Sequence, residues 1–324
     1  MVIPRNLSMT AAWAVLILLW CAGPYAQADT VGDHLWIWGH PAGSYNDGFL
    51  RPMKLVSTIE PVAAAQRMGL KNVIFVRYNG QPMPPFDAYY NPFRKLDRVY
   101  WSLVGAGGGS SSAEREAAFS LAEKNQNLAG FILDDFFYEQ CEGSAADPLP
   151  SPRPDRPLCA SLSPAQLHAL GQRQVRGRKL PLMAVIYTRQ VKPGARPHIA
   201  EVDQLCMWTW RPGDLKHLEA NFTALEKIAP DKQLYLGCYM YGFYESKPLS
   251  VALMQRQVEL GYQWLKAGRI AGIIFLATPN VDVGLEAVEW TRQWIHNHAD
   301  QPLPTRAGTD QGIPHPIFPP RSQS

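Results

Sequence analysis

Two adjacent aspartates, Asp134 and Asp135, end an apolar segment that begins at Gly130. Carboxyl groups are costly to remove from water unless they are hydrogen-bonded, ion-paired or open to a cleft. Neighbouring acids also repel each other, which can raise one pKa and leave the other group ionised, as general acid/base chemistry requires. The pair therefore predicts a catalytic site, and the alternative is a structural role as a helix cap or as a partner of Arg77.

The direction of the two carboxyl groups follows from strand geometry, because successive side chains in a strand point to opposite faces. Asp134 shares a face with Gly130 and Ile132, so we expect it to point toward the interior of the fold. Asp135 reaches the same site only if the chain turns at that residue.

Aromatic side chains recur at the ends of the other apolar segments, although they make up only 11% of the chain. Flat rings suit stacking on the C–H faces of a sugar, while Tyr hydroxyls and indole N–H groups can bond its hydroxyls. The alternative for any single ring is ordinary core packing, and for His40 it is a loop position satisfied by backbone groups. The expected substrate-binding residues are His40, Arg77, Tyr78, Trp101, Tyr187, Trp208, Trp210, Tyr239 and Tyr241.

A glycosidase of the usual kind needs a second carboxyl group, about 5 to 5.5 Å from the first for retention or about 6.5 to 9.5 Å for inversion. We choose Glu245, which follows the seventh apolar segment. Its alternative role is to place negative charge near the start of the following helix. Glu139, Asp47 and Asp282 are further candidates.

The elements that must position these residues are eight apolar, β-branched or aromatic segments that alternate with helical patterns. We expect strands at 35–40, 72–78, 98–104, 130–136, 182–187, 204–208, 233–239 and 270–277. Helices are expected at 61–69, 113–127, 164–175, 215–227, 249–267 and 285–298. The pattern predicts the α/β class and a single-domain (β/α)8 TIM barrel over residues 29–300, with function at the C-terminal ends of the strands. A doubly wound open sheet is the alternative.

Two connecting segments are less regular. Residues 80–97 are rich in proline and aromatic residues and show no convincing helix. Residues 105–109 contain four glycines but lack a Walker lysine and the G-x-G-x-x-G spacing, so we interpret them as a flexible loop rather than a nucleotide site.

The segment 130–137, GFILDDFF, resembles the fourth-strand signature of barrel glycoside hydrolases. Its paired aspartates are similar to those of glycoside hydrolase family 84, the retaining β-N-acetylglucosaminidases. In that family the first aspartate orients the acetamido group of the substrate, which is the nucleophile, and the second is the general acid/base. The resemblance implies these roles for Asp134 and Asp135, over about eight matching residues and the general plan of a barrel.

The N-terminus predicts export to the periplasm or the extracellular space. Arg5 precedes an apolar stretch at 11–20, and Ala26, Gln27 and Ala28 form an A-x-A cleavage site, so residues 1–28 are expected to be a signal peptide. The apolar stretch is too short for a stable membrane anchor, which needs roughly 20 residues. At the other end, the proline-rich residues 301–324 are expected to form an extended or disordered tail.

Cysteine and histidine spacing predicts a disulfide and no metal site. Cys141 and Cys159 flank a proline-rich stretch and are expected to form a disulfide in an oxidising compartment. Cys206 and Cys238 fall in apolar segments, where a free buried thiol is the commoner state. No cofactor or metal is expected, because neither the cysteines nor the histidines show metal-ligand spacing.

The charge balance argues against nucleic acid as a partner. The chain carries 31 basic and 28 acidic residues, a net charge of +3, with no dense basic run. We expect a monomer that binds carbohydrate, and the leading hypothesis is an exported glycoside hydrolase acting on an oligosaccharide or a cell-envelope glycan. The alternatives are a catalytically inactive carbohydrate-binding barrel and another exported barrel enzyme, such as a lyase or deacetylase.

Overall fold

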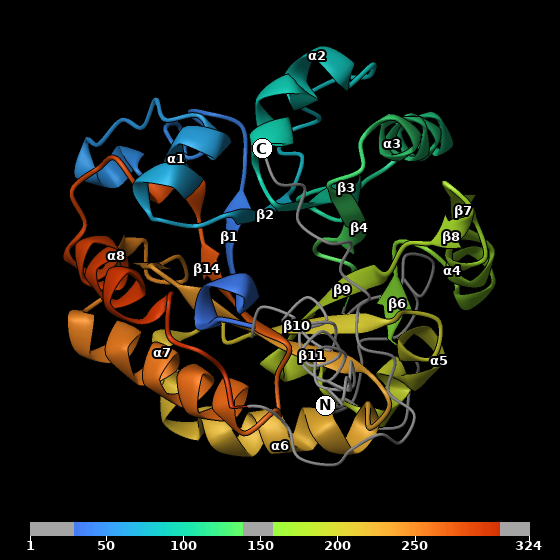
Figure 1. The fold of residues 1–324 in the computed structure, drawn as a ribbon. Helices are drawn as coiled ribbons and strands as arrows, with labels where there is room; N and C mark the ends of the chain where they lie inside the picture. The colour runs from blue at the N-terminus through green and yellow to red at the C-terminus, as the bar shows by residue number, and fades with distance from the viewer. Residues whose placement is uncertain (1–28, 139–157, 305–324) are drawn as a thin grey trace, which may run out of the picture.

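Eight parallel strands close into a barrel in the computed structural model, which describes residues 29–138 and 158–304 (Figure 1). In order around the barrel they are β1 (Leu35–Gly39), β2 (Asn72–Phe75), β3 (Arg98–Val104), β4 (Leu128–Leu133), β9 (Leu182–Tyr187), β10 (Gln204–Trp208), β11 (Gln233–Tyr239) and β14 (Gly272–Leu276). All eight expected strands are present. The pairing of β14 with β1 closes the sheet, which confirms the barrel and excludes the open sheet.

Helices surround the barrel, and one follows each strand (Figure 1). They are α1 (Pro61–Arg67), α2 (Asp87–Tyr90), α3 (Ser112–Lys124), α4 (Pro164–Gly171), α5 (Arg196–Ile199), α6 (Leu218–Ile228), α7 (Val251–Lys266) and α8 (Glu286–His298). Short 3-10 helices are η1 (Val31–His34), η2 (Arg51–Met53), η3 (Asn91–Lys95), η4 (Thr188–Gln190), η5 (Pro193–Ala195), η6 (Pro212–His217) and η7 (Thr278–Asn280). The helix expected from residue 215 begins at Leu218, because η6 occupies the residues before it.

Three two-stranded hairpins lie outside the barrel sheet. They pair β5 (Phe137–Tyr138) with β6 (Cys159–Ala160), β7 (Gln174–Val175) with β8 (Arg178–Lys179), and β12 (Tyr241–Gly242) with β13 (Lys247–Pro248). The first and third follow β4 and β11 in the chain, so they extend from strand ends that also carry candidate site residues.

The segment 80–97, for which the sequence showed no helix, folds into α2 and η3 over an aromatic cluster outside the barrel. Trp101 of β3 is fully buried there, stacked on Phe75 with ring centroids 4.5 Å apart and covered by Phe86 and Phe93. Its neighbour Tyr100 packs against Trp36 at 5.1 Å, on the opposite face of the strand. The expectation that Trp101 binds substrate is therefore wrong in its placement, because strand alternation turns this ring away from the barrel axis.

Candidate functional site

A cavity of about 330 Å³ lies at the C-terminal ends of the strands, where (β/α)8 barrels carry their active sites. Aromatic rings form most of its wall: Trp38, Tyr45, Phe49, Tyr78, Tyr187, Trp210, Tyr239 and Phe243. The other lining residues are His40, Asn79, Ala106, Gly107, Asp134, Asp135 and Leu276. The only carboxyl groups in this lining belong to Asp134 and Asp135, and it contains no lysine or arginine.

Asp134 follows directly after β4 and is only 7% exposed. Its backbone N–H donates to the carbonyl of Val104 at 3.1 Å, which continues the ladder between β3 and β4 by one residue. Burial, and then the nearby charge of Asp135, raises the pKa of the Asp134 carboxyl well above its usual range. This group therefore keeps its proton to a higher pH than an ordinary aspartate, as a general acid must.

Asp135 lies in the turn that ends the strand, with a positive φ of 44°. Strand alternation required a turn at this residue for Asp135 to reach the site. The turn is present, and Asp135 lines the same cavity as Asp134. The carboxyl group accepts hydrogen bonds from the backbone N–H of Gly107 at 2.9 Å and from the hydroxyl of Tyr187 at 2.7 Å. These two donors come from the loop after β3 and the end of β9, so the neighbouring strands fix the orientation of the carboxylate.

The glycine-rich loop after β3 holds Asp135 through backbone groups, a role that its sequence did not reveal. Gly108 has a φ of +76°, and a Cβ at this position would lie 2.1 Å from the hydroxyl oxygen of Tyr138. The Gly108 carbonyl accepts a hydrogen bond from that hydroxyl at 3.0 Å. The loop needs glycine because only a residue without a Cβ fits this close approach, and the contact partners are distant in sequence.

His40 lines the cavity as a neutral imidazole. Trp38 Nε1–H can only donate and lies 3.2 Å from His40 Nε2, so that nitrogen accepts; His40 Nδ1–H then donates to the Val76 carbonyl at 2.9 Å. Burial lowers the pKa of His40 to about 4, which agrees with this assignment. Both ring nitrogens are hydrogen-bonded within the protein, as the alternative of a loop position satisfied by its surroundings predicts. Only the face and the carbon edge of the ring are left to contact a ligand.

Arg77 is a structural residue rather than a wall of the cavity, which corrects its expected role in binding substrate. Its side chain is 6% exposed and donates to the carbonyls of Pro82 at 2.9 Å and Gly80 at 2.7 Å and to the Glu114 carboxylate at 2.6 Å. These bonds tie the loop after β2 to helix α3. Sequence could not show this, because the carboxylate that pairs with Arg77 is Glu114 and not the aspartate pair.

We predict that Glu114→Gln lowers the free energy of unfolding by about 2 kcal/mol at neutral pH, since it leaves the buried Arg77 guanidinium without its counter-ion. Arg77 lowers the pKa of Glu114 to about 2. The contribution is present above the ordinary glutamate pKa and is lost as the pH falls through the lowered value, so wild type and variant should converge in acid. Denaturant titrations across this pH range measure the difference.

The matched control is Glu116→Gln on the same helix, whose carboxylate pairs with Arg173 and is 63% exposed. An exposed pair of this kind contributes less than about 1 kcal/mol. Equal effects of the two substitutions would contradict the buried role assigned to Arg77.

Three further sequence candidates lie close to the cavity without lining it. Trp208 is 1% exposed and packs against Trp38 at 5.4 Å and Tyr239 at 5.1 Å, so it supports the rings of the wall. Tyr241 is buried and donates its hydroxyl to the Phe49 carbonyl at 2.8 Å, which fastens the loop after β1. Glu245 lies on the exposed turn between β12 and β13, where its carboxylate contacts Lys247 Nζ at 2.8 Å.

Glu245 is therefore not the second carboxyl group of this cavity, because the hairpin turns Phe243 rather than Glu245 toward it. Asp282 accepts hydrogen bonds from the backbone N–H groups of Thr58 and Ile59 at 2.9 and 3.1 Å, which fix the segment before α1. Asp47 is exposed and Glu139 lies outside the described residues.

The cavity brings together His40, Tyr78, Tyr187, Trp210 and Tyr239 from the expected set. The sequence interpretation missed Trp38, Tyr45, Phe49, Asn79, Ala106, Gly107, Phe243 and Leu276. Tyr45 and Phe243 lie 5.3 Å apart between ring centroids, so the loops after β1 and β11 meet over the cavity. The aromatic residues Tyr45 and Phe49 of the loop after β1 were a sequence signal for this wall. Phe243 has no such signal of its own, because it lies among other aromatic residues, Tyr241 and Tyr244.

The cysteine predictions are tested only in part. Cys206 and Cys238 are buried free thiols whose pKa values burial raises, as expected for apolar strand positions. Cys141 lies outside the described residues, so its bond to Cys159 stays a prediction. The expected signal peptide and almost all of the expected tail also lie outside them.

The described residues contain neither a metal-binding cluster nor a membrane-spanning helix. They contain no group of three or more His, Cys, Asp or Glu side chains arranged to hold a metal ion. No helix among residues 29–138 and 158–304 combines the length and the hydropathy that crossing a bilayer demands.

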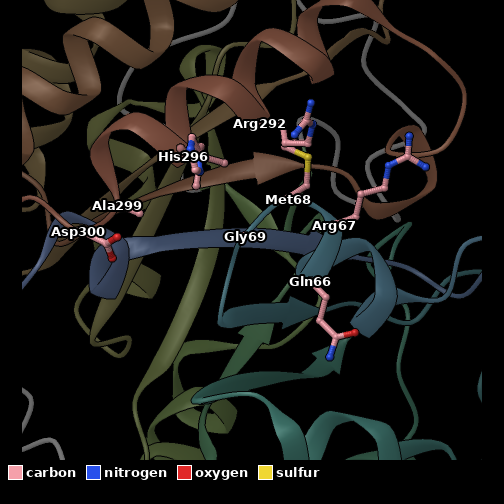
Figure 2. Close-up of a pocket in the computed structure, with 9 residues that line it drawn as sticks. Gln66, Arg67, Met68, Gly69, Arg292, His296, Ala299 and Asp300 are labelled. Carbon is pink, nitrogen blue, oxygen red and sulfur yellow. The ribbon is translucent and has the colours of Figure 1, made fainter.

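A second hollow, of about 250 Å³, lies between the ends of α1 and α8 (Figure 2). Its lining includes Arg67, Arg292, His296 and Asp300. Both helices end at this hollow, so it lies at the N-terminal ends of the strands, away from the aspartate pair. Arg67 and His296 lie in the last turns of their helices, where the negative end of the helix dipole favours basic side chains, and Arg292 pairs with Glu289 at 3.0 Å, so these residues are explained without a ligand.

The comparisons with known proteins concern the fold. No protein-family model matches the sequence, and no curated protein matches it. A GH99 endo-alpha-mannosidase from Bacteroides thetaiotaomicron is similar in structure, with a TM-score of 0.50 and 9% sequence identity over 82% of this chain and 97% of that one. Active domain 2 of a chitinase from Pyrococcus furiosus has a TM-score of 0.49 and 14% identity, over 83% and 95% of the two chains.

The PgaB (BpsB) glycoside hydrolase domain from Bordetella bronchiseptica has a TM-score of 0.44 and 9% identity, over 80% of this chain and 98% of that one. The likeness to the mannosidase confirms the expected resemblance to barrel glycoside hydrolases at the level of the fold. The similarity to family 84 stays a prediction. The chain is thus an α/β protein with the (β/α)8 barrel fold that glycoside hydrolases also use.

Proposed function

We propose that the protein is a glycoside hydrolase that works through Asp134 and Asp135. One observation carries the proposal: a buried carboxyl group with a raised pKa lies beside a hydrogen-bonded one in a cavity walled by aromatic rings. A pair of acids whose environments differ in this way is the arrangement that glycosidic bond cleavage uses. The aromatic wall suits the apolar faces of a sugar ring.

The environments suggest one division of roles. Asp134 holds a proton and donates it to the leaving glycosidic oxygen as the bond to the anomeric carbon breaks. Asp135, oriented by Gly107 and Tyr187, presents its carboxylate to the positive charge that develops on the sugar. A water molecule then adds its hydroxyl group to the anomeric carbon and gives its other proton to the Asp134 carboxylate, which restores the acid. The resemblance to family 84 implies the reverse assignment, in which Asp135 is the acid. The two assignments therefore predict opposite effects for Asp134→Asn and Asp135→Asn on substrates with good and poor leaving groups.

The direct experiment is to incubate the purified protein with a panel of aryl glycosides and of oligosaccharides, and to identify the products by mass spectrometry. We expect turnover of at least one glycoside, with water incorporated at the anomeric carbon. Glycan binding without turnover of any member of the panel would favour the carbohydrate-binding barrel instead. The observation in favour of that alternative is that Glu245 does not complete the cavity with a third carboxyl group.

We predict that Tyr187→Phe lowers kcat about tenfold and changes KM little. The substitution removes the hydroxyl that donates to Asp135 at 2.7 Å but keeps the ring that lines the cavity. A hydrogen bond to a charged group contributes about 1.5 to 3 kcal/mol, and part of it is replaced by water. Steady-state kinetics measures the effect; a loss confined to KM would instead indicate that this hydroxyl binds the substrate.

We propose export on the basis of the N-terminal sequence, with removal of residues 1–28. N-terminal sequencing of the protein recovered from the periplasm or the medium should give Asp29 as the first residue. Recovery of the intact N-terminus from the cytoplasm would contradict export.

A further inference from the structure

An exposed aromatic residue lies at the rim of the cavity, next to residues that line it. Trp210 and Phe243 are part of the wall, with ring centroids 6.4 Å apart and an interplanar angle of 21°. The residues that follow them, Arg211 and Tyr244, lie just outside the lining. Tyr244 is 50% exposed, and the Arg211 guanidinium carbon is 4.7 Å from the centroid of its ring. The two loops that close one side of the cavity thus continue outward as an arginine stacked on a tyrosine.

The backbone holds this pair in place. Tyr244 lies in the tight turn between β12 and β13, where Glu245 N–H donates to the Gly242 carbonyl at 3.1 Å and Ser246 N–H to the Phe243 carbonyl at 3.3 Å. Arg211 precedes the first residue of η6. A stacked pair between two anchored segments is a preorganised surface, which lowers the entropic cost of binding a ligand.

The charges of the rim and the cavity are opposite in sign. The Arg211 guanidinium forms no hydrogen bond or ion pair with the described residues. Glu245, the nearest acid along the hairpin, is paired with Lys247 at 2.8 Å. Inside the cavity the only carboxyl groups are those of Asp134 and Asp135, His40 is neutral, and no lysine or arginine lines it. An anionic group on a ligand is therefore repelled by the cavity and attracted by the rim.

We propose that Tyr244 and Arg211 form a second sugar subsite, which receives the neighbouring sugar of a bound glycan and favours one that carries a carboxylate. The inference rests on the proposed function, because it assigns the cavity to the sugar whose bond is cleaved. The cavity, at about 330 Å³, is at the small end of the range for ligand sites, so the rest of an oligosaccharide must lie at its mouth. There the Tyr244 ring offers a stacking face and Arg211 offers two parallel N–H donors for a carboxylate.

The test compares a chitin tetrasaccharide, which is neutral, with a hyaluronan tetrasaccharide, in which every second sugar is a uronic acid. Titration calorimetry with the full-length mature protein gives the two dissociation constants. We expect the wild type to bind the hyaluronan tetrasaccharide more tightly, and Arg211→Gln to weaken that binding about tenfold relative to the neutral ligand. Tyr244→Ala should weaken the binding of both ligands, and Tyr244→Phe should restore it.

Arg173→Gln is the matched control, since Arg173 is also stacked on an aromatic ring, that of Phe119 at 3.8 Å, but lies between α4 and β7 and pairs with Glu116 of α3. It should leave the ratio of the two constants unchanged. An Arg211→Gln variant with the wild-type ratio, or a wild type that does not bind the hyaluronan tetrasaccharide, overturns the subsite. Hydrolysis assays separate the two proposals. Binding that depends on Arg211, without turnover, would contradict the hydrolase proposal alone. Turnover, with the same ratio of the two dissociation constants in Arg211→Gln and the wild type, would contradict the subsite alone.

Discussion

Asp134→Asn is expected to lower kcat about 10³-fold on glycosides with poor leaving groups, since general acid catalysis contributes about 10² to 10⁴ in rate. Asparagine has nearly the same shape as aspartic acid and has no proton to give. A leaving group that departs without protonation, such as dinitrophenolate, should restore most of the rate. Kinetics with a series of aryl glycosides of falling leaving-group pKa measures this dependence.

The pH profile gives a second signature of the same role. An acid must be protonated to work, so wild-type activity should fall as the pH rises through the raised pKa of Asp134. The alkaline limb should be absent from the profile of Asp134→Asn on the activated substrate. It should persist in Asp135→Asn, because that substitution leaves Asp134 buried in its cavity.

Asp135→Asn is the informative comparison, because the two residues are adjacent and line the same cavity. If Asp135 stabilises positive charge on the sugar, its loss should affect activated and unactivated substrates alike. The opposite result, in which Asp135→Asn is the variant rescued by a good leaving group, would contradict our division of roles and support the order implied by family 84. Full activity of both variants would remove the basis of the hydrolase proposal.

Gly237→Ala is expected to reduce the free energy of unfolding by about 3 kcal/mol, the upper part of the range for overpacking a core. Gly237 lies in β11, and a Cβ there would be 2.2 Å from atoms of the Trp208 ring. That ring is 1% exposed and is held against Trp38 and Tyr239, so it has no free space to enter. Denaturant unfolding followed by tryptophan fluorescence measures the loss.

The same substitution should also disturb the cavity, because Trp38 and Tyr239 line it and lean on the displaced Trp208 ring. Gly213→Ala is the control: Gly213 has open space within 4 Å of its Cβ position and lies in η6 on the outside of the barrel. An equal loss of stability in both variants would show that the effect comes from the backbone rather than from contact with Trp208.

The properties of the two carboxyl groups depend on the barrel around them. Burial within the barrel is what raises the pKa of Asp134, and neighbouring strand ends supply the donors that fix Asp135. The raised pKa of Asp134 and the orientation of Asp135 therefore depend on the closed barrel. A variant that loosens the barrel below the pair should lose activity through the ionisation of Asp134 as well as through a lower folded fraction.

The strands and their order along the chain could be predicted from sequence, because parallel strands buried on both faces appear as uninterrupted apolar runs. The aspartate pair stood out for the same reason, since charge is rare at the end of such a run. Strand alternation predicted that Asp134 points inward. It also predicted that Asp135 would point outward unless the chain turned at that residue. These features depend on residues close together in the chain.

Contacts between distant segments decided the rest. Trp101 and Arg77 have residue types suited to a sugar site, but α2, η3 and Glu114 of α3 cover or pair them on the outer side of the barrel. Glu245 does follow the seventh barrel strand, as expected. The β12–β13 turn, however, exposes Glu245 to solvent and turns Phe243 toward the cavity in its place. Local pattern fixes which face of a strand a side chain occupies, whereas loop conformation and long-range pairing choose which loop residues meet over the barrel, and only the folded chain contains that information.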